Sequence, residues 1–240
     1  VKNCHNHGTV VSNVSSNSYQ RFKVGGVIGF SEAAGLVLED CSNNCDLTLS
    51  GKTKGVFYAG GIMGHTDKNM TAKNLVNNNA LTVNFVGSNA RIGGVVGEFG
   101  GAESTISTLT NNGDITIDGE STGGNIAAGG VIGLTSAPTT GLTNEGNLTF
   151  KGTSSTYYHG GGVIGYNAAA SSDLLNTGSV TYEATPTTYA AAGGVIGYNT
   201  GALTTIAEGK TYVAKNSGVV TLNGTSTTEY YGGGVIGHNT

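Results

Sequence analysis

Histidine side chains are the groups of this chain with the widest chemistry, and their spacing argues against a metal centre. His5 and His7 are two residues apart and could share one strand face as metal ligands, but no third ligand follows nearby. His65 and His238 are distant in sequence, and His159 lies between a tyrosine and a glycine. We therefore expect structural or solvent-exposed histidines, no metal site and no cofactor.

The acidic residues offer only a weak catalytic grouping. A glycosidase or lyase needs carboxylates or bases that converge from neighbouring strands. The best combination is Asp114 and Asp118 with Asn147 and Glu183, whose spacing does not place them in one column. We expect these side chains to be solvated, and the chain not to be an enzyme. A β-helical polysaccharide-cleaving enzyme and an incidental calcium ion in a loop are the remaining alternatives.

A glycine-rich pentapeptide, Gly-Gly-Val-Ile-Gly with small variations, could suggest phosphate binding. A dinucleotide site needs such a turn between a strand and a helix, and a P-loop also needs a following lysine. Neither accompanies these copies, so we reject nucleotide binding. The copies begin at Gly25, Gly60, Gly93, Gly129, Gly161, Gly193 and Gly233.

The pentapeptide belongs to an internal repeat whose copies start 32 to 40 residues apart. Before each copy stands Asn-x-Gly followed by apolar-Thr-apolar, as in NTGSVTY at 176–182, and this alternation is typical of strands. Three short strands per unit predict an all-β, parallel β-helix (β-solenoid) of about seven coils. We expect it to be right-handed and to form a single repeat domain over residues 1–240. The aligned asparagines are Asn6, Asn43, Asn77, Asn111, Asn144, Asn176 and Asn216.

The recurring residues have expected structural roles. The asparagines should form a hydrogen-bonded ladder, and the glycine two residues later should adopt a positive φ. Cys45 occupies that glycine position without an evident reason. The Val-Ile pair is apolar at both positions, whereas alternation would point one outward, so a bulge or a covering loop is needed.

Cysteines leave two interpretations open. Cys4 and Cys41 lie two residues before the asparagine in adjacent coils, where later coils have leucine. A disulfide is compatible with this spacing and with an exported protein. Buried thiols that act as small apolar side chains are the favoured interpretation, and Cys45 leaves an odd count.

The stretch NTGSVTY…AAGGVIGYNTG resembles the GLUG-type repeats of bacterial cell-surface proteins, whose units carry Asn-x-Gly-x-Val, then Val-Gly-Gly-Leu-Val-Gly and an asparagine. The likeness covers essentially the whole chain in seven copies. It implies an exported, extracellular module of the kind found in adhesin-like surface proteins of gut anaerobes, with no catalytic residue in the repeat. We expect the chain to be part of a longer secreted or surface-anchored protein.

Aromatic residues just before the pentapeptide are the candidate ligand-binding side chains. Exposed tyrosines stack on sugar rings or anchor protein partners. We therefore predict an adhesin-like module that presents a ridged face to glycans or to host or neighbouring proteins. A passive spacer is the alternative, because tyrosine is also an ordinary strand-face residue. Alternation points the following side chains outward on one face: Lys23, Tyr58, Arg91, Tyr157, His159, Tyr189 and Tyr231.

Composition narrows the classes of partner. The 11 basic residues are scattered and the net charge is −4, so no basic stripe is available for nucleic acid. No apolar run is long enough to span a membrane. Strand edges without caps at the two ends predict either further domains or end-to-end self-association.

Overall fold

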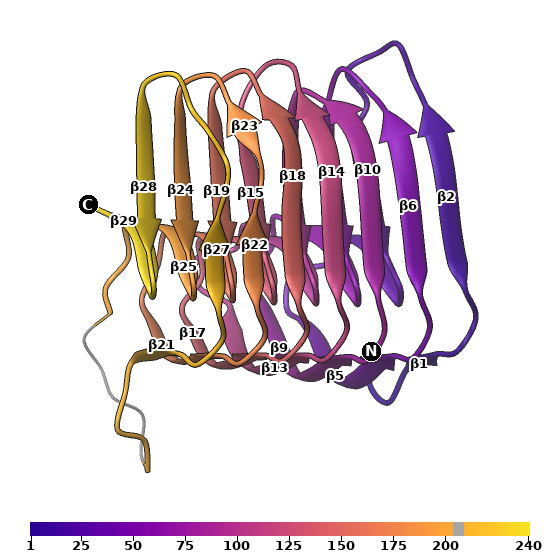
Figure 1. The fold of residues 1–240 in the computed structure, drawn as a ribbon. Helices are drawn as coiled ribbons and strands as arrows, with labels where there is room; N and C mark the ends of the chain where they lie inside the picture. The colour runs from indigo at the N-terminus through magenta and orange to yellow at the C-terminus, as the bar shows by residue number, and fades with distance from the viewer. Residues whose placement is uncertain (204–208) are drawn as a thin grey trace.

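The protein is a β-solenoid. The computed structural model describes residues 1–203 and 209–240, and the regular structure in these ranges consists of β-strands. Each strand pairs in parallel with the equivalent strand of the next coil, which produces four sheets along the length of the molecule. The chain rises through one sheet at the front of Figure 1 and descends through another behind it while coils advance to the left, so the winding is right-handed. The predicted β-helix is confirmed.

The four sheets, named A to D in the order in which a coil passes through them, each contain one strand per coil. Sheet A contains β1 (His5–Asn6), β5 (Leu36–Asn43), β9 (Met70–Asn77), β13 (Thr105–Asn111), β17 (Thr139–Asn144), β21 (Ser171–Asn176) and β26 (Ala214–Asn216). Sheet B contains β2 (Val10–Ser15), β6 (Leu47–Lys52), β10 (Leu81–Gly87), β14 (Ile115–Ser121), β18 (Leu148–Ser154), β22 (Val180–Tyr182) and β27 (Val220–Leu222), with β23 (Thr185–Pro186) pairing beside β18.

The other two sheets flank the glycine pentapeptide. Sheet C contains β3 (Phe22–Gly25), β7 (Val56–Gly60), β11 (Asn89–Gly93), β15 (Ile126–Gly129), β19 (Tyr157–Gly161), β24 (Tyr189–Gly193) and β28 (Glu229–Gly233). Sheet D contains β4 (Ile28–Ser31), β8 (Met63–Thr66), β12 (Val96–Phe99), β16 (Ile132–Thr135), β20 (Ile164–Asn167), β25 (Ile196–Asn199) and β29 (Ile236–Asn239).

A full coil therefore has four strands, and the prediction of three was wrong. The pentapeptide is not one strand but the bend between two, because β7 ends at Gly60 and β8 begins at Met63. At the bend the backbone N–H groups of Ile62 and Met63 both donate to the carbonyl of Val95, at 2.9 and 3.1 Å, as in a β-bulge. Ile62 and Met63 consequently both point into the interior, which explains why both positions of the pair are apolar.

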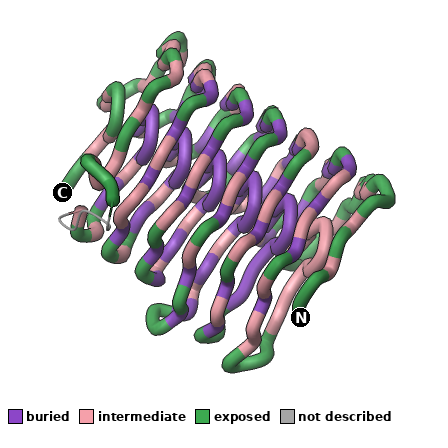
Figure 2. Tube along the Cα trace, turned by 90° about the horizontal axis from the view of Figure 1, so that it is seen from below, coloured by how far each residue is buried: buried purple, intermediate pink, exposed green. Residues whose placement is uncertain are grey.

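The cross-section of a coil is L-shaped, with one hydrophobic core in each arm. Side chains of sheets B and C form the first core, which includes Leu47 from sheet B and Phe57 from sheet C. Side chains of sheets A and D form the second core, which includes Leu38 from sheet A and Met63 from sheet D. Figure 1 shows sheet B upright and sheet A along the base. In Figure 2 the buried residues continue from coil to coil through the middle of the molecule, while the end coils are more exposed.

Buried asparagines occupy the outer corner of the L, between sheets A and B. The side-chain Nδ2 of each donates to Oδ1 of the next, over distances of 2.7 to 3.0 Å from Asn6 to Asn216. Glycine is needed opposite this ladder, because a Cβ at Gly130 would lie 2.6 Å from Cγ of Asn144 and 2.1 Å from the carbonyl oxygen of Gly162. The asparagine side chains and the glycine bend between sheets C and D are therefore in direct contact, and a larger residue in the bend would push the two apart.

The glycine two residues after the ladder does not adopt a positive φ, contrary to expectation. It is required for clearance, since a Cβ at Gly113 would lie 1.9 Å from the carbonyl oxygen of Asn79 in the preceding coil. Positive φ occurs instead in the middle of the sheet A strands, at Asp40, Asn74 and Thr108 among others. The pairing register omits these residues, so the paired strands β5, β9 and β13 are interrupted at the same position.

The three cysteines are free thiols, in agreement with the favoured interpretation. Cys41 is buried in the core of sheets A and D, and the backbone N–H of Cys4 donates to its Sγ at 3.4 Å. The thiol of Cys45 donates to the carbonyl oxygen of Gly8 in the preceding coil at 2.8 Å. Burial raises the pKa of Cys41 and Cys45, so both stay protonated near neutral pH.

Candidate binding face in the inner corner

The inner corner of the L, between the outer surfaces of sheets C and D, collects most of the residues with distinctive chemistry. The bend brings together a side chain of sheet C and the side chain seven residues later in sheet D. Lys23 lies on Phe30, with Nζ 2.9 Å from the ring centroid, and Tyr231 stacks on His238 with ring centroids 4.1 Å apart. Two columns of side chains therefore face each other along the molecule.

We name these the corner columns. Corner column C consists of Lys23, Tyr58, Arg91, Ala127, His159, Ala191 and Tyr231. Corner column D consists of Phe30, His65, Glu98, Leu134, Tyr166, Tyr198 and His238. The first three coils carry charged and aromatic residues, the fourth carries alanine and leucine, and the last three carry mainly tyrosine and histidine.

The last three coils form a continuous group of rings, which we name the aromatic cluster. Its rings contact each other along and across the corner: the centroids of Tyr157 and Tyr189 are 4.2 Å apart along it, and those of Tyr231 and His238 are 4.1 Å apart across it. Its members are Tyr157, His159, Tyr166, Tyr189, Tyr198, Tyr231 and His238. All of them except His159 are partly exposed, and none belongs to either hydrophobic core.

His159 is the floor of the aromatic cluster. It is 2% exposed, its ring stacks on Tyr198 at 4.9 Å, and its Nε2 lies 3.3 Å from Oη of Tyr189. Burial, assisted by the charges of Arg91 and His238, lowers the pKa of His159 to about 3, so its ring is neutral at physiological pH. Burial also raises the pKa of Tyr189, so its hydroxyl stays protonated near neutral pH.

The seven predicted ligand-binding residues divide into two groups. Tyr157, Tyr189 and Tyr231 lie together in the aromatic cluster and are partly exposed. Tyr58 and His159 point away from the cores as expected but are 6% and 2% exposed, because corner column D covers them.

Lys23 and Arg91 lie in the first three coils, outside the aromatic cluster, and contact other residues of the corner. Lys23 lies on Phe30, and Nε of Arg91 lies 3.5 Å from Oε2 of Glu98. Sequence reasoning missed Tyr166, Tyr198 and His238, although the repeated Gly-Tyr-Asn and Gly-His-Asn after the bend mark them.

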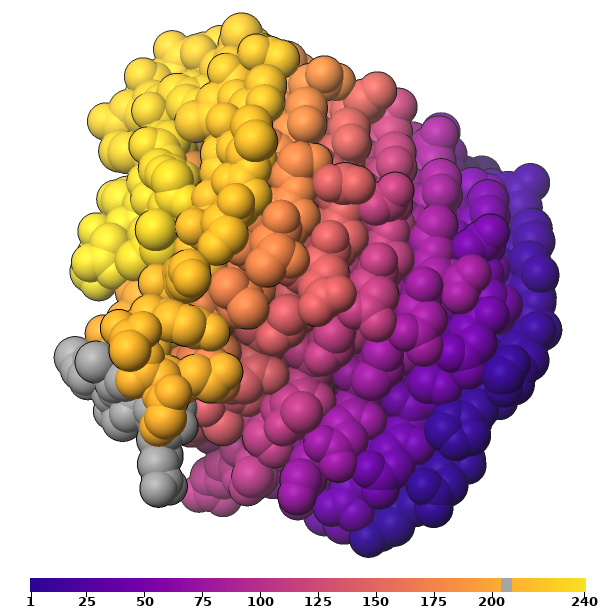
Figure 3. All heavy atoms as spheres, turned by 60° about the horizontal axis from the view of Figure 1, so that its bottom comes forward, coloured from indigo at the N-terminus to yellow at the C-terminus, as the bar shows by residue number. Residues whose placement is uncertain are grey.

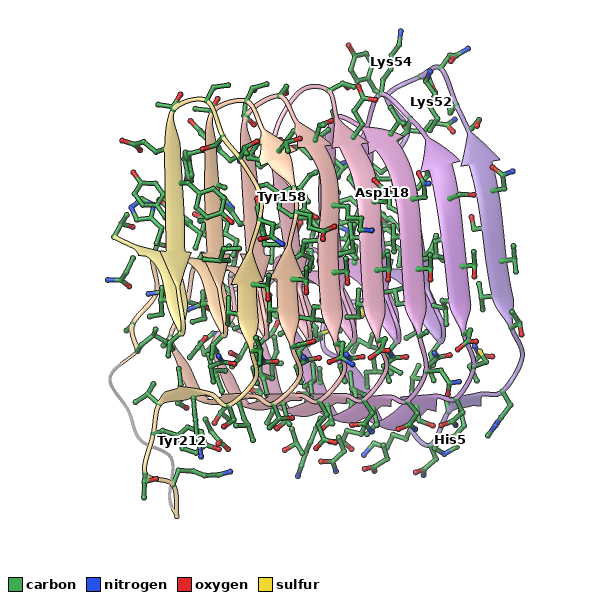
Figure 4. The ribbon with its side chains drawn as sticks, in the orientation of Figure 1. His5, Lys52, Lys54, Asp118, Tyr158 and Tyr212 are labelled. Atoms are coloured by element: carbon green, nitrogen blue, oxygen red, sulfur yellow. The ribbon has the colours of Figure 1, made fainter. Side chains whose placement is uncertain are left out.

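The acidic residues considered as a catalytic grouping lie away from this corner. Asp118 belongs to the outward face of sheet B, beside Lys151, whereas Tyr158 lies inside the core of sheets B and C (Figure 4). Asp114 and Asn147 occupy one column of adjacent coils, and Oδ1 of Asp114 accepts from the Asn147 backbone N–H at 2.8 Å. These exposed contacts tie neighbouring coils together.

A hollow of about 520 Å³ lies at the start of β13, β17 and β21. Hydroxyl groups such as those of Ser104, Thr139 and Ser171 line it, and Glu103 is its charged residue. It has no aromatic lining, so the inner corner is the stronger candidate for ligand binding.

The space-filling view shows the coils as parallel bands of side chains from one end of the molecule to the other (Figure 3).

Comparisons with protein-family models, curated proteins and solved structures find no match for the chain. In residues 1–203 and 209–240 there is also no helix with the length and apolar character needed to cross a bilayer.

Proposed function

We propose that the chain is an extracellular, non-catalytic binding module of a bacterial surface protein, and that the aromatic cluster holds carbohydrate. The observation that carries the proposal is the contiguous set of partly exposed rings at Tyr157, Tyr189, Tyr198 and Tyr231, which fill neither core. Aromatic rings that remain partly exposed offer flat apolar surface with a hydroxyl at the edge, the combination that suits the C–H face and the hydroxyls of a sugar.

The chemistry of the cluster favours a neutral ligand. His159 is uncharged near pH 7, and the pKa of Tyr189 is raised by burial, so neither of these two rings carries a charge. Neighbouring coils stack about 4.8 Å apart, close to the length of one sugar residue, so rings repeated from coil to coil can follow a chain of sugars. The GLUG-type resemblance supports the exported, cell-surface setting.

Binding of the soluble chain to a glycan array and to extracellular-matrix proteins tests this proposal, with released sugars assayed in parallel. We expect saturable glycan binding without product. Tyr157→Ala and Tyr231→Ala should each weaken it at least about tenfold, the effect expected of a central contact residue. Tyr19→Ala is the matched control, because Tyr19 is 82% exposed in the first coil, outside the aromatic cluster.

Three outcomes would contradict the proposal. Binding that Tyr157→Ala and Tyr231→Ala leave unchanged would exclude the aromatic cluster as the site. Release of sugars would favour the polysaccharide-cleaving alternative. A blank on both arrays would favour a passive spacer, an interpretation compatible with four sheets that continue through all the coils.

A further inference from the structure

A second group of residues in the inner corner combines one imidazole with two carboxylates. His65 lies in β8, Asp67 follows that strand directly, and Glu98 lies beside His65 in the adjacent strand β12. One ligand atom from each of these three residues lies within 4.8 Å of the other two. The group belongs to the second and third coils, so it is separate from the aromatic cluster.

His65 is the unusual member, because it is fully buried without a hydrogen bond. Its exposure is 0%, and neither ring nitrogen has a hydrogen-bond partner among the described residues. The ring is held between Phe30 and Tyr58, with centroid distances of 5.5 and 4.2 Å. Buried polar groups nearly always have a partner, yet Nδ1 of this imidazole has none among the described residues and Nε2 has only the two carboxylates beside it.

The two carboxylates lie next to Nε2 of this imidazole. Oδ1 of Asp67 is 2.9 Å from Nε2, without the alignment of a hydrogen bond, and Oε1 of Glu98 is 3.9 Å from it. Zinc binds histidine nitrogen and carboxylate oxygen at about 2.0–2.2 Å, which puts two ligands of a tetrahedral site about 3.4 Å apart. The two distances lie on either side of that value, so small side-chain rotations would complete the geometry.

Three cations, Arg91, Lys23 and Arg21, act on this group, and the first two contact other side chains or carbonyls. Nε of Arg91 lies 3.5 Å from Oε2 of Glu98, the oxygen that does not face His65, and its Nη1 donates to the carbonyls of Ala90 and Asn125. Lys23 lies against the ring of Phe30. Arg91 therefore orients Glu98, as groups behind metal ligands commonly do, and leaves its other oxygen available.

We propose that His65, Asp67 and Glu98 bind a divalent transition-metal ion of the zinc class. The nitrogen ligand favours such an ion over calcium or magnesium, which prefer oxygen alone. Three protein ligands leave a fourth position free. Asp67 also lines a hollow of about 330 Å³ with Phe30, Ser31, Glu32 and Lys68, so its carboxylate can be reached from solvent.

Calorimetric titration of the chelator-treated chain with Zn²⁺ tests this site, with Ca²⁺ as a parallel titrant. We expect one equivalent of Zn²⁺ to bind saturably and to raise the melting temperature, and Ca²⁺ not to compete. Asp67→Asn and Glu98→Gln should each weaken Zn²⁺ binding at least about tenfold, a loss that even residues behind metal ligands can cause. Asp67 is exposed, so Asp67→Asn should fold normally even if His65→Gln does not.

His238→Gln is the matched control, since His238 occupies the same corner column as His65 without a neighbouring carboxylate pair. It should leave Zn²⁺ affinity unchanged. Absence of saturable Zn²⁺ binding would overturn the proposal, and so would binding that both Asp67→Asn and Glu98→Gln leave intact. Binding lost on His5→Gln but retained in those two variants would assign the metal to the N-terminal histidines, and binding of Ca²⁺ in preference to Zn²⁺ would also overturn it.

Discussion

Asn111 illustrates what one side chain does for the stacking of coils. Its amide donates to the carbonyl of Gly113 at 2.7 Å and to Oδ1 of Asn144 at 2.8 Å, and its own Oδ1 accepts from Asn77. Because all these groups are buried, Asn111→Ala leaves a donor and two acceptors without partners.

We expect Asn111→Ala to lower the free energy of unfolding by about 2–4 kcal/mol, the sum of a few unpaired buried groups. Chemical denaturation monitored by circular dichroism measures the loss. Asn112→Ala, at the neighbouring exposed position, should cost less than about 1 kcal/mol. Equal losses in the two variants would mean that the ladder contributes little beyond ordinary surface hydrogen bonds.

Burial of His159 makes stability depend on pH. The pKa of His159 is about 3 in the folded state against about 6.5 in an unfolded chain, so below pH 6.5 the unfolded state binds the extra proton. Its stabilising contribution is complete above pH 6.5 and is lost as the pH falls toward 3, by about 1.4 kcal/mol per pH unit.

Unfolding curves between pH 4 and pH 7 measure this dependence. His159→Gln should flatten the slope by about one proton, because glutamine does not titrate in this range. A slope that does not change in His159→Gln would show that the imidazole is reached by water in the folded protein.

At the scale of elements, the bend between sheets C and D is the tightest part of each coil. Gly130 lies between β15 and β16, and a Cβ there would lie 2.1 Å from the carbonyl oxygen of Gly162 and 2.6 Å from Cγ of the ladder residue Asn144. We expect Gly130→Ala to lower the free energy of unfolding by more than about 3 kcal/mol, because the contact is with backbone.

Gly123→Ala provides the comparison for this substitution. A Cβ at Gly123 would come no closer than 3.4 Å to another atom, so the change should be within about 0.5 kcal/mol of neutral. Thermal and urea unfolding of the two variants measure the difference. A mild effect of Gly130→Ala would mean that the bend can open without loss of the stacking.

Strands and their repetition could be predicted from the sequence, because in each case a single structural requirement produces a recognisable residue pattern. Alternation in stretches such as NTGSVTY predicted the strands, and the period predicted the solenoid. The role of glycine could not be predicted, because a position with no room for a Cβ and a position with positive φ both favour glycine. Gly113 has no room for a Cβ, whereas positive φ occurs at residues such as Asp40 and Thr108. The fourth strand of each coil, and the contact between a sheet C side chain and the sheet D side chain seven residues later, both depend on the angle of the bend. No local sequence pattern predicts that angle.

At the scale of the whole molecule, stability should vary along the axis. Strand β14 in the fourth coil is paired on both sides and alternates buried with exposed residues, whereas β2 and β27 pair on one side and have no buried residue. Stacked repeats owe much of their stability to contacts with neighbouring coils, so the outer coils should open most readily.

Hydrogen–deuterium exchange measured by mass spectrometry should therefore show the slowest exchange in peptides from β10, β14 and β18. Exchange should be faster by orders of magnitude in β2 and β27. Uniform protection from the first coil to the last would indicate instead that the molecule opens as one cooperative unit.

The asparagine ladder also gives the molecule a direction. Every amide donates toward the C-terminal coil and accepts from the N-terminal one, so each coil has a donor side and an acceptor side. A coil duplicated in tandem meets its neighbours with the same two sides, and a coil deleted leaves matching sides behind. Duplication or deletion of one repeat therefore changes the length of the protein by about 4.8 Å and preserves the contacts between neighbouring coils.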